Sequence, residues 1–196
     1  MSALHAVAVF CGSNPGARPD YVAAAEATGR AIAEAGLTLV YGGASVGCMG
    51  ALADAALAAD GRVVGVIPQA LIDKEIAHKG LSANLVTHSM HERKAKMADM
   101  ADGFIALPGG AGTMEEMFEI WTWGQLGLHH KPLALLDVAG FFDPLRAFLD
   151  HQTEERFMKP AHRHMLLNGD DPAELLTRMA AYEPPSVTKW IGPEET

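Results

Sequence analysis

The stretch Phe104-Ile105-Ala106-Leu107-Pro108-Gly109-Gly110-Ala111-Gly112-Thr113-Met114-Glu115-Glu116 predicts how the chain folds. Its apolar first part is typical of a buried strand, and a helix is expected to start at Thr113. Three glycines within four residues separate these elements, and without Cβ atoms the backbone N–H groups of such a turn can converge on an anion. The helix directs its positive end toward the same place. The sequence therefore predicts a phosphate-binding turn with carboxylates beside it.

This turn differs from two common phosphate-binding motifs. Counted from Gly110, the third glycine of the dinucleotide motif G-x-G-x-x-G would fall on Glu115. The chain also contains no Gly-Lys pair, which a Walker-type loop requires. The turn therefore predicts a phosphate site of another kind.

Apolar runs and helical patterns alternate along the whole chain. Strands are expected at 6–11, 37–41, 63–67, 85–87, 103–107 and 132–136, with 162–167 weakly extended. Helices are expected at 21–35, from the second glycine turn to 59, at 91–100, 113–128, 142–155 and 172–181. This alternation predicts an α/β fold: one Rossmann-like, doubly wound parallel sheet flanked by helices. Residues 68–81 form an irregular segment that could cover a site.

Two further glycine-rich turns follow predicted strands. Gly12-Ser13 follows the first strand and Gly42-Gly43 the second. The carboxyl ends of parallel strands meet at one edge of a sheet, where open α/β sheets bind their ligands. We therefore expect Gly12, Ser13, Gly42 and Gly43 to belong to loops around one crevice.

Length and charge limit the classes of function. A chain of 196 residues is long enough for one well-buried domain, which we place at 1–182, followed by a flexible tail at 183–196. The formal net charge of −9 argues against a nucleic-acid or anionic-membrane surface. The N-terminus lacks the pattern of a signal peptide or a membrane span, and the two cysteines, Cys11 and Cys48, are expected to be reduced. A cytoplasmic protein is expected.

Charged residues near the glycine turn have competing interpretations. Thr113 and Glu116 have the spacing of a helix capping box, although Glu116 also begins an apolar helix face with Ile120 and Trp123 and so favours a pocket. Arg93 lies in a methionine stripe, where it either extends its head group into water or points into the crevice to grip a phosphate or ribose. Lys94 falls off this stripe and is expected to be solvated.

Two other polar residues carry no local signal. Glu75 is most simply a surface charge, and Thr122 is most simply a helix residue bonded to its own preceding turn. No set of residues has the spacing of metal ligands, so we expect no metal and no cofactor.

The motif Pro108-Gly109-Gly110-Ala111-Gly112-Thr113-Met114-Glu115-Glu116 resembles the PGGxGTxxE signature of the Lonely Guy (LOG) family. Met90-His91-Glu92-Arg93-Lys94-Ala95 is similar to the second signature of this family, and Trp123-Gly124-Gln125-Leu126-Gly127 to the third. The resemblance extends from Phe10 to about Leu176. Ala111 replaces a frequent tyrosine, which could alter the preference for a base.

The resemblance implies a Rossmann-like homodimer that cleaves the N-glycosidic bond of a nucleoside 5′-monophosphate. These enzymes are cytokinin riboside 5′-monophosphate phosphoribohydrolases, and they release the free base and ribose 5-phosphate. Positions that match the family imply catalytic roles for Arg93 and Glu116. The positions with an implied substrate-binding role are Glu75, Arg93, Lys94, Gly110, Ala111, Gly112, Thr113, Met114, Glu115, Glu116 and Thr122.

Two alternatives to this function are open at this point. Molybdenum-cofactor carrier proteins have similar glycine turns, so the chain could be a non-catalytic nucleotide or cofactor carrier; an intact Arg93 and Glu116 pair argues against this. Many LOG relatives were once labelled lysine decarboxylases. The sequence shows no pyridoxal-phosphate lysine site, and a free amino acid needs no phosphate-binding turn, so we reject this label.

Overall fold

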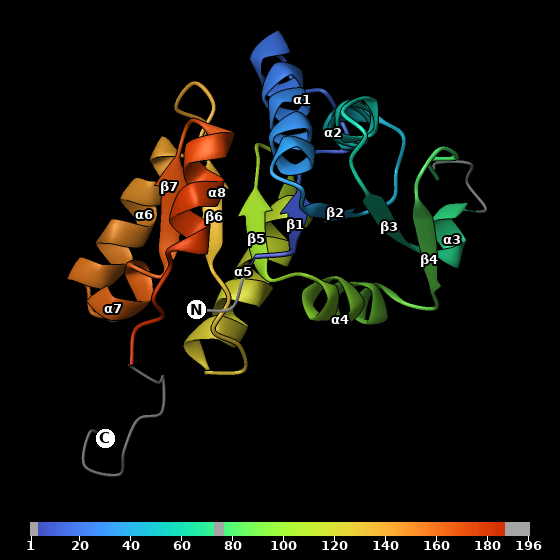
Figure 1. The fold of residues 1–196 in the computed structure, drawn as a ribbon. Coiled ribbons are helices and arrows are strands. Elements are labelled where there is room, and N and C mark those ends of the chain that lie inside the picture. Colours follow the sequence, from blue (N-terminus) through green and yellow to red (C-terminus); the bar gives the residue numbers. More distant parts are fainter. Residues whose placement is uncertain (1–3, 73–76, 187–196) are drawn as a thin grey trace.

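The strands form one parallel sheet in this computed structural model, which describes residues 4–72 and 77–186. Seven strands lie in the order β4-β3-β2-β1-β5-β6-β7, and each neighbouring pair is parallel (Figure 1). The strands are β1 Ala6–Phe10, β2 Thr38–Tyr41, β3 Val63–Pro68, β4 Ala83–Thr87, β5 Gly103–Ala106, β6 Leu133–Leu136 and β7 Leu166–Gly169. The predicted parallel sheet is confirmed.

Helices cover both faces of this sheet, with α1 and α2 on one face and α4 and α5 on the other (Figure 1). The helices are α1 Pro19–Glu34, α2 Gly47–Ala58, α3 Gln69–Ile72, α4 Met90–Met100, α5 Ala111–Gln125, α6 Asp143–Glu154, α7 Pro160–Arg163 and α8 Pro172–Ala180. Side chains of β5 alternate between the two layers: Phe104 packs with α4 and α5, and Ile105 packs with α1 and α2. Burial on both faces explains why the strands are apolar throughout.

The order of the strands reverses at β1, which lies between β2 and β5. The chain proceeds outward from β1 through β2, β3 and β4, and then returns to place β5 on the other side of β1. Loops that leave β1 and β5 therefore meet at a topological switch point, the usual ligand crevice of open α/β sheets. The N–H of Gly12 donates to the carbonyl of Pro108 at 3.2 Å and so joins these two loops.

Some predicted boundaries were wrong. Helix α5 begins at Ala111, two residues before Thr113, with Gly110 as its N-cap. The capping-box interpretation of Thr113 and Glu116 is therefore wrong. Helix α2 begins at Gly47, within the second glycine run. The segment 162–167 contains the end of helix α7, which starts at Pro160, and the start of edge strand β7.

The domain boundary at 182 stays a prediction, and residues 187–196 of the tail lie outside the described residues. Across 4–72 and 77–186, no helix has both the length and the apolar character that crossing a bilayer requires.

Because Gly29 has no side chain, the backbone of α1 can lie close against the backbone of α2. A Cβ atom at this position would lie 2.1 Å from the backbone carbonyl oxygen of Leu52. We predict that Gly29→Ala lowers the free energy of unfolding by about 1–3 kcal/mol because the helix backbones must separate. Urea denaturation measures this change. Gly112→Ala in α5 is the matched control, because a Cβ there meets no atom within 4 Å; equal losses in both variants would contradict the account.

Candidate active site

A pocket of about 290 Å³ lies at the carboxyl edge of the sheet, where the loops after β1 and β5 meet helices α4 and α5. It combines backbone from the glycine turn with one arginine and two glutamates. Its lining consists of Cys11, Gly12, Ser13, Met49, Met90, Arg93, Gly110, Ala111, Gly112, Thr113, Glu115 and Glu116. We call it the catalytic pocket. The fold therefore brings three segments that are far apart in sequence to one place.

Arg93 reaches this pocket from the first turn of α4. Its guanidinium Nη2 lies 3.1 Å from Oε1 of Glu116, and its Nε donates to the backbone carbonyl of Val66 at 3.1 Å. Only 8% of the arginine side chain is exposed. The interpretation that its head group extends into bulk water is therefore wrong. Contacts with β3 and α5 hold the guanidinium in one orientation at the pocket wall.

Gly42 makes room for this guanidinium. A Cβ atom at Gly42 would lie 2.3 Å from Nη2 of Arg93. The next residue, Gly43, has a φ of +77°, and its carbonyl accepts a hydrogen bond from the N–H of His78 at 2.9 Å. Among the described residues, neither glycine lines the catalytic pocket. The second glycine turn therefore supports Arg93 from behind, whereas Gly12 and Ser13 lie at the pocket surface.

Glu116 is a buried carboxyl group in a mixed electrostatic environment. Burial raises its pKa, the charge of Arg93 lowers it, and Glu115 raises it again; the net pKa lies above the ordinary value of 4.5. A raised pKa makes the ionised carboxylate a better proton acceptor than an exposed glutamate. Position and basicity together suit a general base at a reacting centre.

Lys94 connects α4 to α5. Its Nζ lies 2.5 Å from Oε1 of Glu115 and 2.8 Å from Oε2 of Glu119, and 5% of its side chain is exposed. The prediction of a solvated lysine is therefore wrong. Burial lowers its pKa, but hydrogen bonds and charges from the two glutamates outweigh this effect, so the pKa is raised overall. Lys94 is a fixed cation that holds Glu115 at the pocket.

The first turn of α5 presents backbone N–H groups to the pocket. The N–H of Met114 donates to the carbonyl of Gly110 at 3.2 Å, which closes the first helical turn. The preceding N–H groups, of Ala111, Gly112 and Thr113, have no carbonyl partner within the helix. A Cβ atom at Gly110 or Gly112 would meet no atom within 4 Å. The glycines therefore leave open space in front of these amides, as anion binding requires.

Among the described residues that line the catalytic pocket, four of the implied substrate-binding positions do not occur: Glu75, Lys94, Met114 and Thr122. Glu75 lies outside the described residues. Met114 packs against the core on the α4 and α5 face. Thr122 lies six residues after Glu116, about 9 Å further along the helix axis, and is not among the described residues that line the catalytic pocket. The roles of Glu75, Lys94, Met114 and Thr122 stay predictions, as do those of the residues that line the pocket.

Three lining residues were not predicted from the sequence. Cys11 directly follows β1, Met49 lies in the second glycine run, and Met90 starts α4. Each adjoins a segment that the sequence does place at the crevice. Which neighbour faces the pocket depends on the three-dimensional course of the loops, so only Met90, on the helix face of Arg93, carried a usable signal.

The two cysteines, and the question of a metal site, are the remaining chemical features of this region. Cys11 and Cys48 are buried and free, as the sequence predicts. Burial, followed by the nearby Cys48 and Glu116, raises the pKa of Cys11 well above its ordinary value, so this thiol is a poor nucleophile. Within the part of the chain that the structure describes, no group of three or more His, Cys, Asp or Glu side chains could hold a metal ion.

Comparison with solved structures identifies related folds. A molybdenum cofactor binding protein from Rippkaea orientalis superimposes with a TM-score of 0.69 at 21% identity, over 90% of this chain and 96% of the other. The molybdenum cofactor carrier protein of Chlamydomonas reinhardtii gives a TM-score of 0.68 at 20% identity, over 91% and 99% of the two chains. At these identities the likeness concerns the fold alone.

Sequence comparison is more specific. A family model described as "Possible lysine decarboxylase" matches residues 49–179. A cytokinin riboside 5′-monophosphate phosphoribohydrolase from Rhodococcoides fascians is 52% identical over 162 residues, which cover 82% of each chain. A protein of the same name from Arabidopsis thaliana is 44% identical over 178 residues, 91% of this chain and 78% of the relative. The chain therefore belongs to the Lonely Guy (LOG) family.

Proposed function

We propose that this protein hydrolyses the N-glycosidic bond of adenosine 5′-monophosphates, with or without a substituent on N6, and releases the free base and ribose 5-phosphate. The observation that carries this proposal is the buried pair of Arg93 and Glu116, 3.1 Å apart, beside the open amides of α5 in one pocket. The names of the relatives from Rhodococcoides fascians and Arabidopsis thaliana support the same reaction.

The phosphate binds at the first turn of α5. The N–H groups of Ala111, Gly112 and Thr113 donate to its oxygens, and the positive end of the helix stabilises its charge. The guanidinium of Arg93 contacts the phosphate or the sugar while it remains paired with Glu116. This anchoring fixes the ribose relative to the carboxylate of Glu116. Because the substrate has already lost its translational and rotational freedom on binding, the activation barrier of the hydrolysis is lower.

Glu116 acts on the ribose. Departure of the base builds positive charge on C1′, an oxocarbenium-like transition state that a nearby carboxylate stabilises. The same carboxylate accepts a proton from the attacking water, for which its raised pKa is suited. Water adds to C1′, the electron pair of the glycosidic bond leaves with the base, and the base takes up a proton. Met49 and Met90 offer apolar surface to the flat base.

The two rival functions fit the site less well. A carrier needs to bind its ligand but has no use for a buried ion pair beside the binding turn in which the pKa of the glutamate, Glu116, is raised. A pyridoxal-phosphate lysine decarboxylase needs a lysine that readily loses its proton to form a Schiff base. Lys94, next to the catalytic arginine, instead has a raised pKa and two glutamate partners.

We also propose a cytoplasmic homodimer. Trp123 of α5 is only half-buried within its own chain, and the nearby Leu128 is 71% exposed beside a groove lined by Ala95 and Ala98 of α4. Such an exposed apolar groove is typical of an interface. Trp121, in contrast, is buried within its own chain and donates its indole N–H to the carbonyl of His162. Light scattering tests the dimer: a monomer at micromolar concentration would contradict it.

The proposed cytoplasmic location rests on the cysteines. Cys11 and Cys48 are free, which suits a reducing compartment, and a cell-fractionation experiment checks the location.

Glu116→Gln should retain AMP binding and lose turnover by about a hundredfold or more, because a neutral amide cannot accept a proton or stabilise the transition-state charge. Chromatography of the products from AMP and from isopentenyladenosine monophosphate measures both the reaction and its loss. Glu26→Gln, at an exposed position of α1, is the matched control and should keep wild-type turnover. Full activity of Glu116→Gln, or no base released by the wild type, would overturn the proposal.

Gly42→Ala should reduce kcat/KM on the order of a hundredfold, because the added methyl group displaces the guanidinium of Arg93 from Glu116. Circular dichroism and urea denaturation verify that the variant is folded. The same substitution in an Arg93→Ala background provides the control. There it should cause no further loss, because no guanidinium remains to be displaced; equal losses in both backgrounds would show that Gly42 acts in another way.

The acid limb of the pH profile reports the ionisation of Glu116. Because the carboxylate must be ionised and its pKa is raised, activity should be present at neutral pH and be lost as pH falls through a value above the ordinary 4.5. The dependence of kcat on pH measures this limb. An acid limb at or below the ordinary glutamate value, in a protein still folded at that pH, would assign the base to a more exposed carboxyl group.

A further inference from the structure

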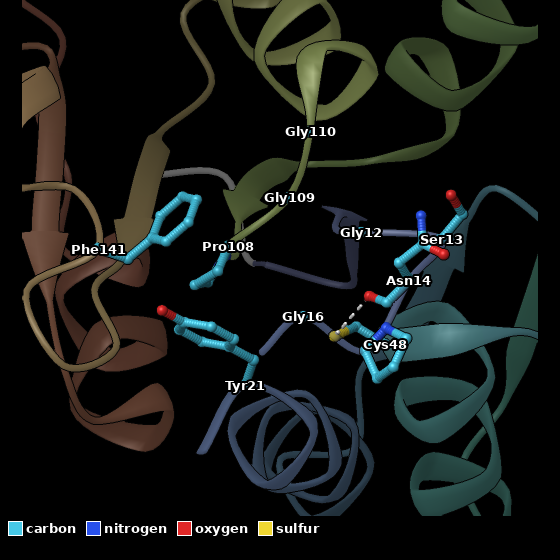
Figure 2. Close-up of a pocket in the computed structure, with 11 residues that line it drawn as sticks. Gly12, Ser13, Asn14, Gly16, Tyr21, Cys48, Pro108, Gly109, Gly110 and Phe141 are labelled. Atoms are coloured by element: carbon cyan, nitrogen blue, oxygen red, sulfur yellow. Dashed lines mark hydrogen bonds between the residues drawn. The ribbon is translucent and has the colours of Figure 1, made fainter. Parts of the chain in front are cut away.

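A second pocket of about 300 Å³ lies on the other side of the glycine turn (Figure 2). It shares Gly12, Ser13 and Gly110 with the catalytic pocket. Gly12 lines both pockets, and its N–H donates to the carbonyl of Pro108, which lines the second pocket; we call this contact the ridge. We call this second space the aromatic pocket. It adjoins the reaction site, yet the proposed mechanism does not use it.

One wall of the aromatic pocket is built from rings. Figure 2 shows Tyr21, Phe141 and Pro108 on the same side of the space. The rings of Tyr21 and Phe141 pack edge to face with their centroids 5.6 Å apart. Phe141 packs in the same way on the buried Phe142, with a distance of 5.1 Å between the ring centroids. A Cβ at Gly16 would lie 2.6 Å from the Tyr21 ring, so the backbone packs closely on it. The wall is therefore fixed before any ligand arrives.

The opposite wall is polar but uncharged. It carries Ser13, Asn14 and Cys48 (Figure 2). The Cys48 thiol donates to the backbone carbonyl of Asn14 at 3.5 Å and holds this loop in place. The side chains of Ser13 and Asn14 are exposed and make no hydrogen bond to other residues within 4–72 and 77–186. Their hydroxyl and amide lie at the rim of the pocket, and groups of this kind can donate to and accept from the edge of a stacked heterocycle.

The charge of the lining distinguishes the two pockets. The catalytic pocket contains Arg93, Glu115 and Glu116, whereas no Asp, Glu, Lys, Arg or His is among the described residues that line the aromatic pocket. An anion would therefore find no cationic side chain in the aromatic pocket. Its volume lies at the lower end of the range for small-ligand sites, which suits one ring system better than a complete nucleotide.

We propose that the aromatic pocket binds an uncharged purine base at the same time as a sugar phosphate occupies the catalytic pocket. The proposal rests on the proposed function, because the hydrolysis supplies such a base next to the ridge. The base stacks on the wall of Tyr21 and Phe141, and Ser13 and Asn14 bind its edge. The aromatic pocket is then a second site, at which the product base binds while the anionic ligand stays in the catalytic pocket.

Calorimetric titration of adenine tests the proposal. The titration uses the Glu116→Gln variant saturated with AMP, which fills the phosphate, sugar and base positions of the catalytic pocket. Adenine should still bind this complex with one site per chain, because independent sites do not compete. Displacement of adenine in direct competition with AMP would overturn the proposal, as would the absence of adenine binding. Because this variant should lose turnover by about a hundredfold or more, the titration measures binding rather than reaction. Failure to hydrolyse AMP would overturn the proposed function and leave this measurement valid.

Variants locate the bound base. Phe141→Ala should weaken adenine binding roughly tenfold, as expected for loss of one stacking partner, and leave ribose 5-phosphate binding unchanged. Asn14→Ala, in an exposed loop, provides a second variant that should also weaken adenine binding. Phe148→Ala on α6, where the ring is 55% exposed, is the matched aromatic control and should have wild-type affinity. Unchanged adenine affinity in both Phe141→Ala and Asn14→Ala would place the base elsewhere and contradict the proposal.

Discussion

The ion pair between Arg93 and Glu116 is the interaction on which the site depends. Two charges with little exposure are costly unless they are paired and hydrogen-bonded. The carbonyl of Val66 accepts the Nε–H of the arginine, and Gly42 leaves space for the guanidinium. Strand β3, the second glycine turn and helices α4 and α5 therefore all contribute to one pair. This arrangement keeps a basic carboxylate beside a cation with little exposure to solvent, a condition that strengthens electrostatic catalysis.

The topology of the sheet explains why this pair lies next to anion-binding amides. The order reverses at β1, so the loop after β5 lies against the loop after β1 and not at a distant edge. Helix α5 leaves the glycine turn directly, which places its first amides and Glu116 on the same helix less than two turns apart. Lys94 then fixes Glu115 from α4. The charged catalytic pocket and the uncharged aromatic pocket share Gly12, whose N–H donates to the carbonyl of Pro108.

Local patterns in the sequence predict the strands and the glycine turn well, because each is marked by its own run of residues. The apolar run before Pro108 has to be buried, and the glycines that follow favour a turn over a longer strand. The environment of Lys94 could not be predicted in this way, since its two glutamate partners lie on another helix. The role of Gly42 could not be predicted for the same reason. The space that it leaves for Arg93 matters only because the end of β2 lies next to α4, which no local pattern contains. Helix α5 begins two residues before the predicted start because Gly110 acts as its N-cap without a side-chain hydrogen bond. A glycine N-cap is a weaker signal in the sequence than the Thr-x-x-Glu spacing, which predicted a start at Thr113.

A double-mutant cycle on Arg93 and Glu116 tests the central claim most directly. The quantities to compare are kcat/KM for AMP in the wild type, Arg93→Met, Glu116→Gln and the variant that carries both changes. If the two residues act as one unit, the double variant should be about as impaired as the worse single variant, because the second change removes something already lost. Losses that multiply across the cycle would show that the two side chains act independently, and would contradict the account of the site as a single buried pair.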